Sequence, residues 1–352
     1  MDGPLSLQMK DINWYLSEAT VQQASDLHLI VDMSPTIRID GTQHSLPCEP
    51  LCAEEVKRLV YGLMSPEQRS KFERELELNF GFSVPQLGRF RVNVYVSRGR
   101  VEAALRAVSL RPKNPEQLGL PPAVVELGKR TSGLILVVGA AGQGKTTTLA
   151  SLIDVINRGE RRCRIITIED PIEYLHESIN SVIIQREVGS DTVSFQSALV
   201  QALRQDPNVL CIGEMRDLET ISTALTAAET GHLVLATLHS RDTIQTIERI
   251  VDVFPAYQQP QIRLQLASSI EGIIAQRLLP RKDGTGRVLA AELLLGSLPV
   301  RNTIREARQH QLTSYLETSM DNTISELYEA GSISYEIARA NMKDMQNLKA
   351  QS

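Results

Sequence analysis

The chain is poor in cysteine, in aromatic residues and in net positive charge, and each shortage argues against a class of protein. Its four cysteines, Cys48, Cys52, Cys163 and Cys211, include one close pair only, whereas a structural zinc site usually needs two such pairs. We therefore expect no zinc. Aromatic residues make up 4% of the chain and the formal net charge is -5 at pH 7, whereas nucleic-acid binders usually carry a basic excess. We therefore expect no nucleic-acid partner.

Long apolar runs and a secretory leader are also missing. No stretch approaches the roughly 18 apolar residues that a membrane-spanning helix needs. The first residues, MDGPLSLQMKDINW, have Asp2 where a leader would carry positive charge. We expect a cytoplasmic protein, which would need a partner to hold it at a membrane.

The first part of the chain mixes helix and strand patterns. Residues 89–96 alternate apolar and polar side chains, and residues 97–100 form a turn before a returning strand. This arrangement predicts a β-hairpin. The expected elements are helices at 12–24, 53–64 and 66–75 and strands at 27–31, 37–39, 89–96 and 101–108.

Four prolines between residues 112 and 122 indicate a linker, so we expect an N-terminal α+β domain at 1–111 and a second domain at 123–352. In the second domain, short apolar runs alternate with helical patterns, which predicts a doubly wound α/β fold. Residues 262–278 form a longer pattern that predicts a helix, and the residues after Pro299 should be mostly helical, with the last dozen frayed. The other expected elements are strands at 134–138, 165–168, 209–212 and 233–238 and helices at 146–157, 195–204, 220–229 and 243–253.

One segment of the second domain has the full pattern G-x-x-x-x-G-K-[ST], between an expected strand and an expected helix. Its glycines let backbone N–H groups converge on phosphates, and the helix N-terminus adds the positive end of its dipole. Lys145 would contact the terminal phosphates, and the hydroxyl of Thr146 would bind Mg²⁺. The pattern therefore predicts a P-loop that binds ATP with Mg²⁺. The expected nucleotide-binding residues are Gly139, Ala140, Ala141, Gly142, Gln143, Gly144, Lys145, Thr146 and Thr147.

Acidic residues follow two of the expected strands. Glu214 comes one glycine after residues 209–212, and an acidic cluster that ends in Glu173 follows residues 165–168. Carboxylates at the carboxyl ends of parallel strands lie on the P-loop side of such a sheet, where they can hold Mg²⁺ through water and orient the attacking water. Without the P-loop, we would interpret the same cluster as a solvated turn.

Several motifs in a fixed order give the chain a specific resemblance. The P-loop, the acidic box at 168–174, the stretch ALVQALRQDPNVLCIGEMRD and the segments 227–232 and 237–239 resemble the secretion-ATPase superfamily. The match runs from residues 25–29 to residues 299–306, and within the superfamily the chain is similar to the type IV pilus retraction ATPases, the PilT family.

The resemblance implies a PAS-like N-terminal domain and a RecA-like ATPase domain with a helical C-terminal region. It also implies ATP hydrolysis that powers pilus retraction and twitching motility. The motor would be a homohexamer at the cytoplasmic face of the inner membrane, acting with the pilus machinery and its membrane platform protein.

The resemblance also assigns roles to residues. Glu173 would be the general base, and Glu214 the Walker B acid that, with Thr146, holds Mg²⁺. His232 and His239 would belong to the family's His box, although both could simply cap the strand between them. The hairpin arginines would face the nucleotide of the neighbouring subunit, although a row of charges is more often solvated surface. The expected catalytic residues are Lys145, Glu173, Glu214, His232, His239, Arg91, Arg98 and Arg106.

Two segments depart from the family pattern. The P-loop has Ala140-Ala141-Gly142-Gln143 where Pro-Thr-Gly-Ser is more usual, which puts the turnover rate in question. The late motif has Pro299, Val300 and Thr303 where the family prefers Ala, Ile and Leu, which puts the coupling to motion in question.

The late motif, residues 299–306, has two open interpretations. Val300 and Ile304 share an apolar face, and Arg301 and Arg305 share the face beside it. The segment is either a helix that packs on the catalytic core or an element that passes motion to the platform protein.

Other motors remain as alternatives. Assembly ATPases of the superfamily usually have a longer N-terminal region and a four-cysteine zinc element, so their absence here favours retraction. The accessory retraction ATPase of the PilU type is the nearest alternative, and a RecA-like nucleic-acid motor is a less favoured one.

Overall fold

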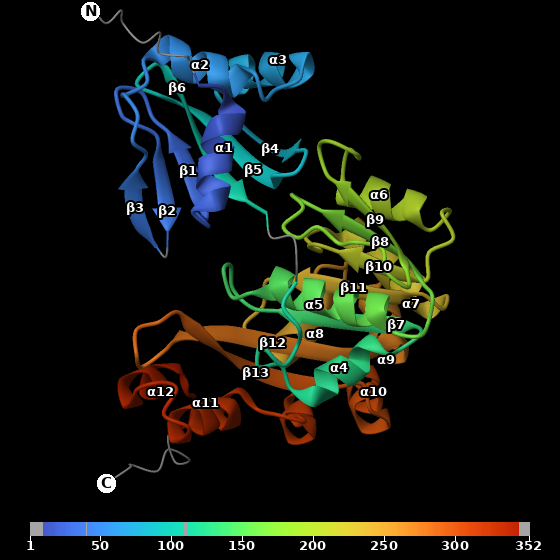
Figure 1. Cartoon of the computed structure of the whole chain (residues 1–352). Coiled ribbons are helices and arrows are strands. Elements are labelled where there is room, and N and C mark those ends of the chain that lie inside the picture. Colours follow the sequence, from blue (N-terminus) through green and yellow to red (C-terminus); the bar gives the residue numbers. More distant parts are fainter. Residues whose placement is uncertain (1–9, 40, 109–111, 345–352) are drawn as a thin grey trace, which may run out of the picture. The chain divides into compact units, whose positions relative to one another are not determined.

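The computed structural model describes residues 10–39, 41–108 and 112–344 (Figure 1). It divides into two compact units, Met1–Leu110 with Pro171–Leu175 and Arg111–Asp170 with His176–Ser352. Residue 111, where we expect the first domain to end, and residues 345–352 of the expected frayed end lie outside the described residues. None of the helices in the described part is long and apolar enough to span a membrane.

The first unit combines helices with an antiparallel sheet. Its elements are α1 (Ile12–Val21), β1 (Asp26–Leu29), β2 (Thr36–Ile39), β3 (Thr42–Ser45), α2 (Ala53–Tyr61), α3 (Pro66–Glu75), β4 (Glu77–Val84), β5 (Gly88–Ser97) and β6 (Arg100–Ala107). The strands lie in the order β3-β2-β1-β6-β5-β4. Alternation puts apolar side chains on one face, where Leu27, Val92 and Leu105 are at most 2% exposed and share a core with α1, α2 and α3. The opposite face is left to polar side chains.

The expected β-hairpin is present as β5 and β6. Arg98 and Gly99 form its turn with positive φ values of 51° and 75°, which is the backbone twist that suits two-residue hairpin turns. Arg91 lies directly opposite Arg106 in the strand register. The hairpin therefore presents two guanidinium groups side by side on the polar face of the sheet.

The second unit is a mostly parallel sheet with helices on both faces (Figure 1). Its elements are α4 (Pro122–Gly128), β7 (Gly133–Val138), α5 (Lys145–Arg158), β8 (Arg164–Glu169), β9 (Val182–Glu187), α6 (Phe195–Ala202), β10 (Val209–Ile212), α7 (Leu218–Glu229), β11 (Leu233–Leu238), α8 (Thr243–Asp252), α9 (Gln259–Ser269), β12 (Ile270–Pro280), β13 (Arg287–Leu295), α10 (Leu298–Arg305), η1 (Gln309–Tyr315), α11 (Met320–Glu329) and α12 (Tyr335–Asn341). The strand order is β13-β12-β7-β11-β10-β8-β9. Helices α4 and α5 pack on one face, and α6 to α10 pack on the other. The expected doubly wound α/β domain and mostly helical C-terminal region are confirmed.

The expected helix at residues 262–278 is wrong. Helix α9 ends at Ser269, and strand β12 starts at Ile270 and inserts between β7 and β13. A strand covered on both faces is apolar at successive positions, so its pattern cannot be told from that of a buried helix. Gly272 adds a constraint, because a Cβ there would lie 2.6 Å from the side chain of Leu127. The sequence patterns also do not predict β3, β4, β9 and β13.

The late motif forms α10, and its two arginines differ. Val300 and Ile304 are 0% exposed in the core of the unit, so this helix does pack on the catalytic fold. Arg301 donates to the carbonyl oxygen of Gly296 (2.8 Å), to the carbonyl oxygens of Ala267 and Ser268 at the end of α9, and to Glu271 Oε1 (2.6 Å). The two arginines lie four positions apart in one helix, as expected, but only the side chain of Arg301 is tied to neighbouring elements. Arg305 is exposed and donates to Asn302 Oδ1 within its own helix (2.9 Å).

We predict that Arg301→Ala lowers the free energy of unfolding by about 1–3 kcal/mol, because it leaves the carbonyl oxygens at the end of α9 and the carboxylate of Glu271 without this partner. Arg305→Ala is the matched control in the same helix, and it should change this free energy by less than about 0.5 kcal/mol. Denaturant unfolding of the two variants measures both values. Equal stability of the two would show that the Arg301 contacts contribute nothing.

Candidate functional site

Four neighbouring parallel strands of the second unit end at one edge of the sheet, and a polar segment follows each of them. β7 leads into the P-loop (residues 139–146), β11 into His239, and β10 into Gly213 and Glu214, while β8 ends at Glu169. β11 lies between β7 and β10. His239 therefore emerges between the P-loop and Glu214.

The P-loop backbone has the conformation that its glycines allow. Gly139, Gly142 and Gly144 have φ values of 152°, 74° and 82°. A Cβ on Gly139 would lie 2.7 Å from the carbonyl oxygen of Gln276, so no other residue fits there without a shift of the backbone. Helix α5 begins directly after Gly144, and no side chain caps its first N–H groups. These N–H groups and the helix dipole make the site suited to a phosphate.

The unusual P-loop residue Gln143 has a structural role. Its side-chain Oε1 accepts from the backbone N–H of Leu278 (2.6 Å), and its carbonyl oxygen accepts from Gln276 Nε2 (2.9 Å). Arg287 donates to the neighbouring carbonyl oxygen of Gly142 (3.0 Å). The side chain of Gln143 thus adds one bond to β12, while backbone carbonyl oxygens of the P-loop make the other bonds to β12 and β13.

Lys145 is buried at the first position of α5, with 8% of its surface exposed. Its Nζ donates to the carbonyl oxygens of Gly139 and Ala140, at 2.9 Å each, and lies 3.3 Å from His239 Nδ1. The ammonium group is thus held over the P-loop, where its charge can act on bound phosphate.

Glu214 is held between two cationic or protonatable groups. Its Oε1 is 3.1 Å from His239 Nε2, and its Oε2 is 2.6 Å from Arg216 Nη2. Burial acts to raise the pKa of Glu214, but the hydrogen bond from Arg216 and the charges of nearby groups, including Lys145, outweigh it and lower the pKa. Glu214 is therefore a carboxylate at neutral pH. His239 contacts both Lys145 and Glu214, so three of the expected catalytic residues form one connected cluster.

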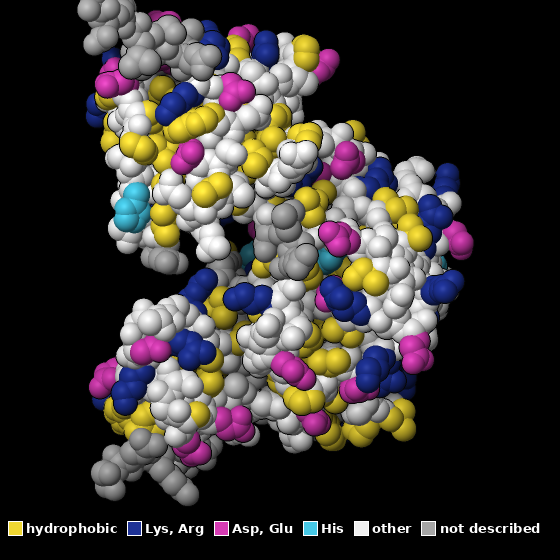
Figure 2. Space-filling view, in the orientation of Figure 1, with side chains coloured by type: hydrophobic (Ala, Val, Ile, Leu, Met, Phe, Trp, Pro, Cys, Tyr) yellow, Lys and Arg dark blue, Asp and Glu magenta, His cyan; other side chains and the backbone are white. Residues whose placement is uncertain are grey.

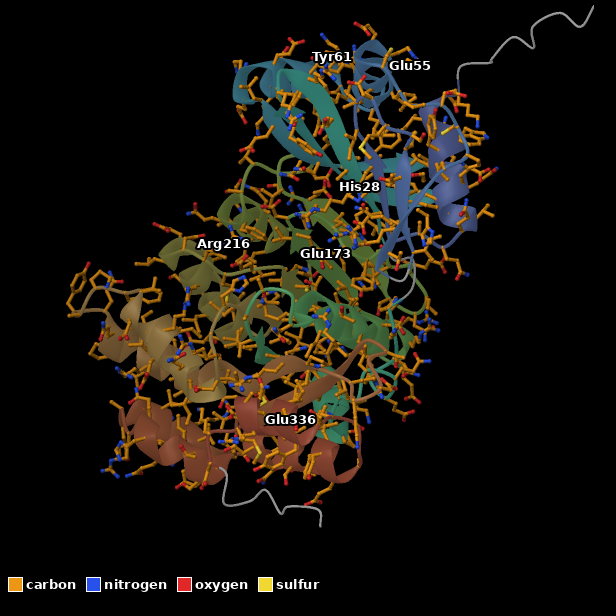
Figure 3. All side chains as sticks on the ribbon, turned by 90° about the vertical axis from the view of Figure 1, so that its left-hand side faces the viewer. His28, Glu55, Tyr61, Glu173, Arg216 and Glu336 are labelled. Atoms are coloured by element: carbon orange, nitrogen blue, oxygen red, sulfur yellow. The ribbon has the colours of Figure 1, made fainter. Side chains whose placement is uncertain are left out.

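The acidic box separates into a buried part and an exposed part. Glu169 is 9% exposed, and its Oε1 accepts from Thr167 Oγ1 (2.7 Å) and Gln185 Nε2 (3.0 Å). Glu173, labelled in Figure 3, has an exposed side chain in the segment Pro171–Leu175, which groups with the first unit. There its Oε1 lies 3.8 Å from Arg91 Nη1. Of the two glutamates, Glu173 is the one that water reaches freely.

The other expected residues lie apart from this cluster. His232 precedes β11, at the opposite end from His239, and a strand of six residues spans roughly 20 Å. Its Nδ1 is 3.1 Å from the carbonyl oxygen of Ala227, at the end of α7. Within one chain, His232 therefore lies apart from the Lys145–His239–Glu214 cluster and contacts the end of α7, and its active-site role stays a prediction. Arg98 lies in the hairpin turn, seven positions along β5 from Arg91, and so outside the Arg91–Arg106 pair.

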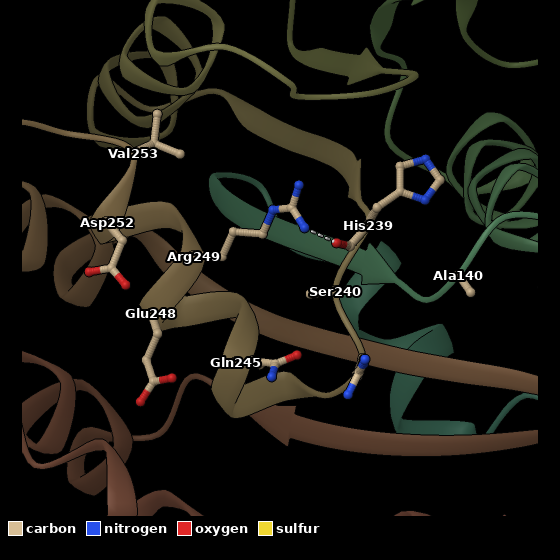
Figure 4. Close-up of a pocket in the computed structure, with 9 residues that line it drawn as sticks. Ala140, His239, Ser240, Gln245, Glu248, Arg249, Asp252 and Val253 are labelled. Atoms are coloured by element: carbon tan, nitrogen blue, oxygen red, sulfur yellow. Dashed lines mark hydrogen bonds between the residues drawn. The ribbon is translucent and has the colours of Figure 1, made fainter.

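The sequence analysis missed Arg249 and the other α8 residue that holds the segment after β11 in place. Arg249, on α8, donates to the backbone carbonyl oxygen of His239, and the two residues line a pocket of about 590 Å³ beside Ala140 (Figure 4). The hydroxyl of Ser240 is 2.6 Å from that of Thr246, also on α8. No local sequence pattern indicates these contacts, because they depend on how the chain turns between His239 and α8.

A second pocket, of about 540 Å³, lies beside the start of helix α5. Gly144 and Thr147 of the P-loop helix line it, together with Leu118 of the expected linker and Arg287 of β13. The pocket continues directly from the phosphate site. It has room for the rest of a nucleotide beside the P-loop.

His176 follows the acidic box, and its pKa lies well below the ordinary value of a histidine. Burial lowers the pKa of His176 to about 4, against an ordinary value of 6.5, and its backbone N–H donates to Gln185 Oε1 (2.9 Å). The folded protein thus holds His176 neutral, while the unfolded chain takes up a proton below pH 6.5. Stability from this group is present above pH 6.5 and is lost as the pH falls towards 4.

We predict that between pH 6.5 and pH 4 the wild type loses up to about 3 kcal/mol more of its free energy of unfolding than His176→Gln does. The glutamine cannot titrate, so it removes this proton uptake. Denaturant unfolding at several pH values measures the difference. His310→Gln, at an exposed position, is the control and should follow the wild type. Parallel curves for wild type and His176→Gln would contradict the prediction.

Comparison with known proteins gives full-length matches. The profile of the family described as "Type II/IV secretion system protein" matches residues 4–351. The type IV pilus retraction ATPase PilT of Pseudomonas aeruginosa is 42% identical over 344 residues, which cover 96% of this chain and 99% of that protein. The type IV pilus ATPase PilU of the same species is 38% identical over 332 residues, which cover 92% of this chain and 87% of that protein.

A solved structure agrees with these matches. The crystal structure of the pilus retraction motor PilT with bound ADP has a TM-score of 0.90 and 47% identity, over 95% of this chain and 98% of that one. The expected two-part fold and the resemblance to retraction ATPases are confirmed. The chain belongs to the family of type II/IV secretion system proteins, among its pilus retraction ATPases.

Proposed function

We propose that this chain is an ATP-hydrolysing motor that powers retraction of a type IV pilus. The observation that carries the proposal is the link from Lys145 through His239 to Glu214 beside the P-loop. It joins a phosphate-binding cation to the acid that an ATPase needs, in a chain whose relatives are named retraction ATPases. The phosphates lie on the first turn of α5, and the ribose and base extend into the pocket lined by Thr147 and Leu118.

Mg²⁺ fits the oxygen donors beside the P-loop. Thr146 supplies a hydroxyl in the first turn of α5, and Glu214 supplies a carboxylate at the end of the strand β10, directly or through water. When bound, Mg²⁺ neutralises charge on the phosphates and favours departure of ADP. Glu214 remains ionised at neutral pH because of Arg216 and its other cationic neighbours, so it keeps its capacity as a ligand.

Hydrolysis needs a water that attacks the γ-phosphorus while the bond to the ADP oxygen breaks. Glu173 orients this water and takes its proton, because its carboxylate is exposed while that of Glu169 is occupied inside the sheet. Lys145 stabilises the negative charge on the terminal phosphates. His239 contacts both Lys145 and Glu214, so it responds when either of them engages a ligand.

The working assembly is a homohexamer in which the first unit of one subunit completes the site of its neighbour. Arg91 and Arg106 lie opposite each other on the polar face of a sheet and supply paired positive charge for the neighbour's γ-phosphate. An arginine in this role is worth about 10³–10⁵ in rate in known ATPases and GTPases. Arg98, at the hairpin turn, contributes to the same subunit contact.

Retraction is favoured over the alternative motors. The chain lacks the four-cysteine element of assembly ATPases, and its relatives cover nearly its full length. Charges of both signs are interspersed over the face of the second unit in view in Figure 2, which gives a nucleic acid no continuous basic track. The similarity to PilU keeps an accessory retraction role as the second candidate.

The motor acts at the cytoplasmic face of the inner membrane, where α10 is the proposed contact with the platform protein. Its inner face is buried, while Leu298 is 71% exposed at its start and Arg305 is exposed at its end. The exposed side of α10, between Leu298 and Arg305, is the surface that this helix can offer to a protein partner. Arg301 is excluded from this contact surface because it is bonded to α9 and β12.

We predict that Lys145→Ala and Glu173→Gln separate nucleotide binding from hydrolysis. Lys145 contacts phosphate in the ground state, so its loss should weaken ADP and ATP binding about tenfold to a hundredfold. Glu173 acts on water in the transition state, so Glu173→Gln should bind nucleotide normally and lower kcat by about 10²–10⁴. Fluorescent-nucleotide binding and steady-state ATPase assays measure these effects. Wild-type turnover in Glu173→Gln would remove Glu173 from this role.

We predict that the gene's deletion in its host leaves pili that extend but do not retract. Complementation with the wild-type chain should restore retraction, and Glu173→Gln should not. Leu298→Ser and Arg305→Ala together should keep ATPase activity and hexamer mass yet fail to restore retraction, because they alter only the exposed side of α10. Normal retraction in the deletion strain would overturn the proposed function, and full complementation by the α10 variant would overturn only the contact surface.

A further inference from the structure

The polar face of the first unit carries a continuous row of charged side chains across four strands. Arg38 on β2 lies opposite Asp26 on β1, Asp26 lies opposite Arg106 on β6, and Arg106 lies opposite Arg91 on β5. His28, labelled in Figure 3, lies two residues along β1 and marks the same face. Directly opposed residues of antiparallel strands have Cβ atoms about 4.5–5.5 Å apart. The row therefore sets three guanidinium groups and one carboxylate within reach of one another.

Asp26 is the residue that makes this row stable. Like charges placed directly opposite each other destabilise a sheet, so the three arginines need counter-charges. Arg91 has Glu173, whose Oε1 lies 3.8 Å from its Nη1, and Arg106 and Arg38 have Asp26. Asp26 Oδ1 accepts from Arg106 Nε (2.8 Å), and its Oδ2 accepts from Ser25 Oγ (2.8 Å) and lies 3.8 Å from Arg38 Nε. Burial acts to raise the pKa of Asp26, but the hydrogen bonds from Ser25 and Arg106 and the neighbouring arginine charge lower it. Asp26 is therefore ionised at neutral pH, although only 8% of its surface is exposed.

The way in which Asp26 holds Arg106 leaves the outer part of the guanidinium available. The bond uses Nε, the nitrogen nearest the backbone, so this carboxylate does not take up the donors of the two terminal nitrogens. The side chain of Arg106 remains 66% exposed while that of Asp26 is 9% exposed. The buried carboxylate of Asp26 thus holds Arg106 at Nε, while the rest of the guanidinium group is exposed. This arrangement suits binding of a phosphate more than local stability alone.

We propose that Asp26 is a positioning residue, which holds Arg106 in the orientation that reaches the terminal phosphate on a neighbouring copy of this chain. The inference rests on the proposed function, since it deepens the role given there to Arg106. Asp26 touches no nucleotide itself. It sets the direction of Arg106 by a charge-assisted hydrogen bond and offsets the repulsion from Arg38 and Arg91.

Asp26→Asn tests the proposal, because asparagine keeps the size of the side chain and removes its charge. Misplacing a catalytic group by about 1 Å costs about 10²-fold in rate, so kcat should fall about tenfold to a hundredfold. The KM for ATP and the affinity for fluorescent ADP should stay within about twofold, because the P-loop belongs to the other unit. Asp26→Glu, which keeps the charge, should retain more of kcat than Asp26→Asn.

Asp32→Asn is the matched control. Asp32 pairs with Arg100 at the other end of β6, but both side chains are exposed and lie outside the row. This variant removes an Asp–Arg pair from the same sheet, and it should keep kcat within about twofold of the wild type. Loss of kcat in both variants would show that any disturbed ion pair slows the enzyme, and it would overturn a specific role for Asp26.

A double-mutant cycle separates positioning from other effects. In an Arg106→Ala background, Asp26→Asn should lower kcat by no further factor, because the group that it orients is gone. A full additional loss would overturn the proposal. An Arg106→Ala enzyme with wild-type kcat would instead remove the arginine from the proposed ring site, whatever Asp26 does. If Asp26→Asn does not fold, Ser25→Ala, which removes one bond to the same carboxylate, should lower kcat by a smaller factor, and an unchanged kcat in Ser25→Ala would contradict the proposal.

Discussion

The candidate site depends on one constraint, the common direction of β7, β11, β10 and β8. Parallel strands carry whatever follows them to the same edge of the sheet, where the N-terminus of α5 also lies. The insertion of β11 between the P-loop strand and the strand before Glu214 decides which residue stands between them. His239 contacts both Lys145 and Glu214 for this reason, and its backbone is fixed in turn by Arg249.

The parts that the sequence predicts are those encoded by short stretches of chain. The P-loop, its strand and its helix are adjacent in sequence, and the glycines that allow its backbone conformation can be identified directly in the sequence. Glu214 is predictable because a strand, a glycine and an acid form one local pattern. The hairpin of β5 and β6 is predictable because alternation and a turn with glycine occur together, so the pairing of Arg91 with Arg106 follows from their distances to the turn.

The parts that the sequence does not predict depend on long-range contacts. β12 is apolar at successive positions because it is covered on both faces, and no periodicity distinguishes it from a helix. Arg301 and Arg305 are equivalent on a helical wheel, but the end of α9 meets only one of them. His232 and His239 bracket one strand symmetrically, and only the direction of β11 decides which reaches the P-loop. The contact of Asp26 with Arg106 requires the register between β1 and β6, whose residues are 80 positions apart.

The charges of the two units show how the ATPase would be controlled by assembly. In the second unit, Lys145 and Glu214 are joined through His239, and Arg216 also pairs with Glu214, so two cations of one chain share the carboxylate of Glu214. In the first unit, Asp26 and Glu173 balance part of a row of three arginines and leave an excess of positive charge on an exposed face. Such an excess is costly unless an anion meets it, and the polyphosphate of ATP carries the highest density of negative charge in the proposed system. In the proposed ring, a site that gains this cation from the next chain would tie hydrolysis to assembly, so that ATP would be hydrolysed only where subunits can move against each other.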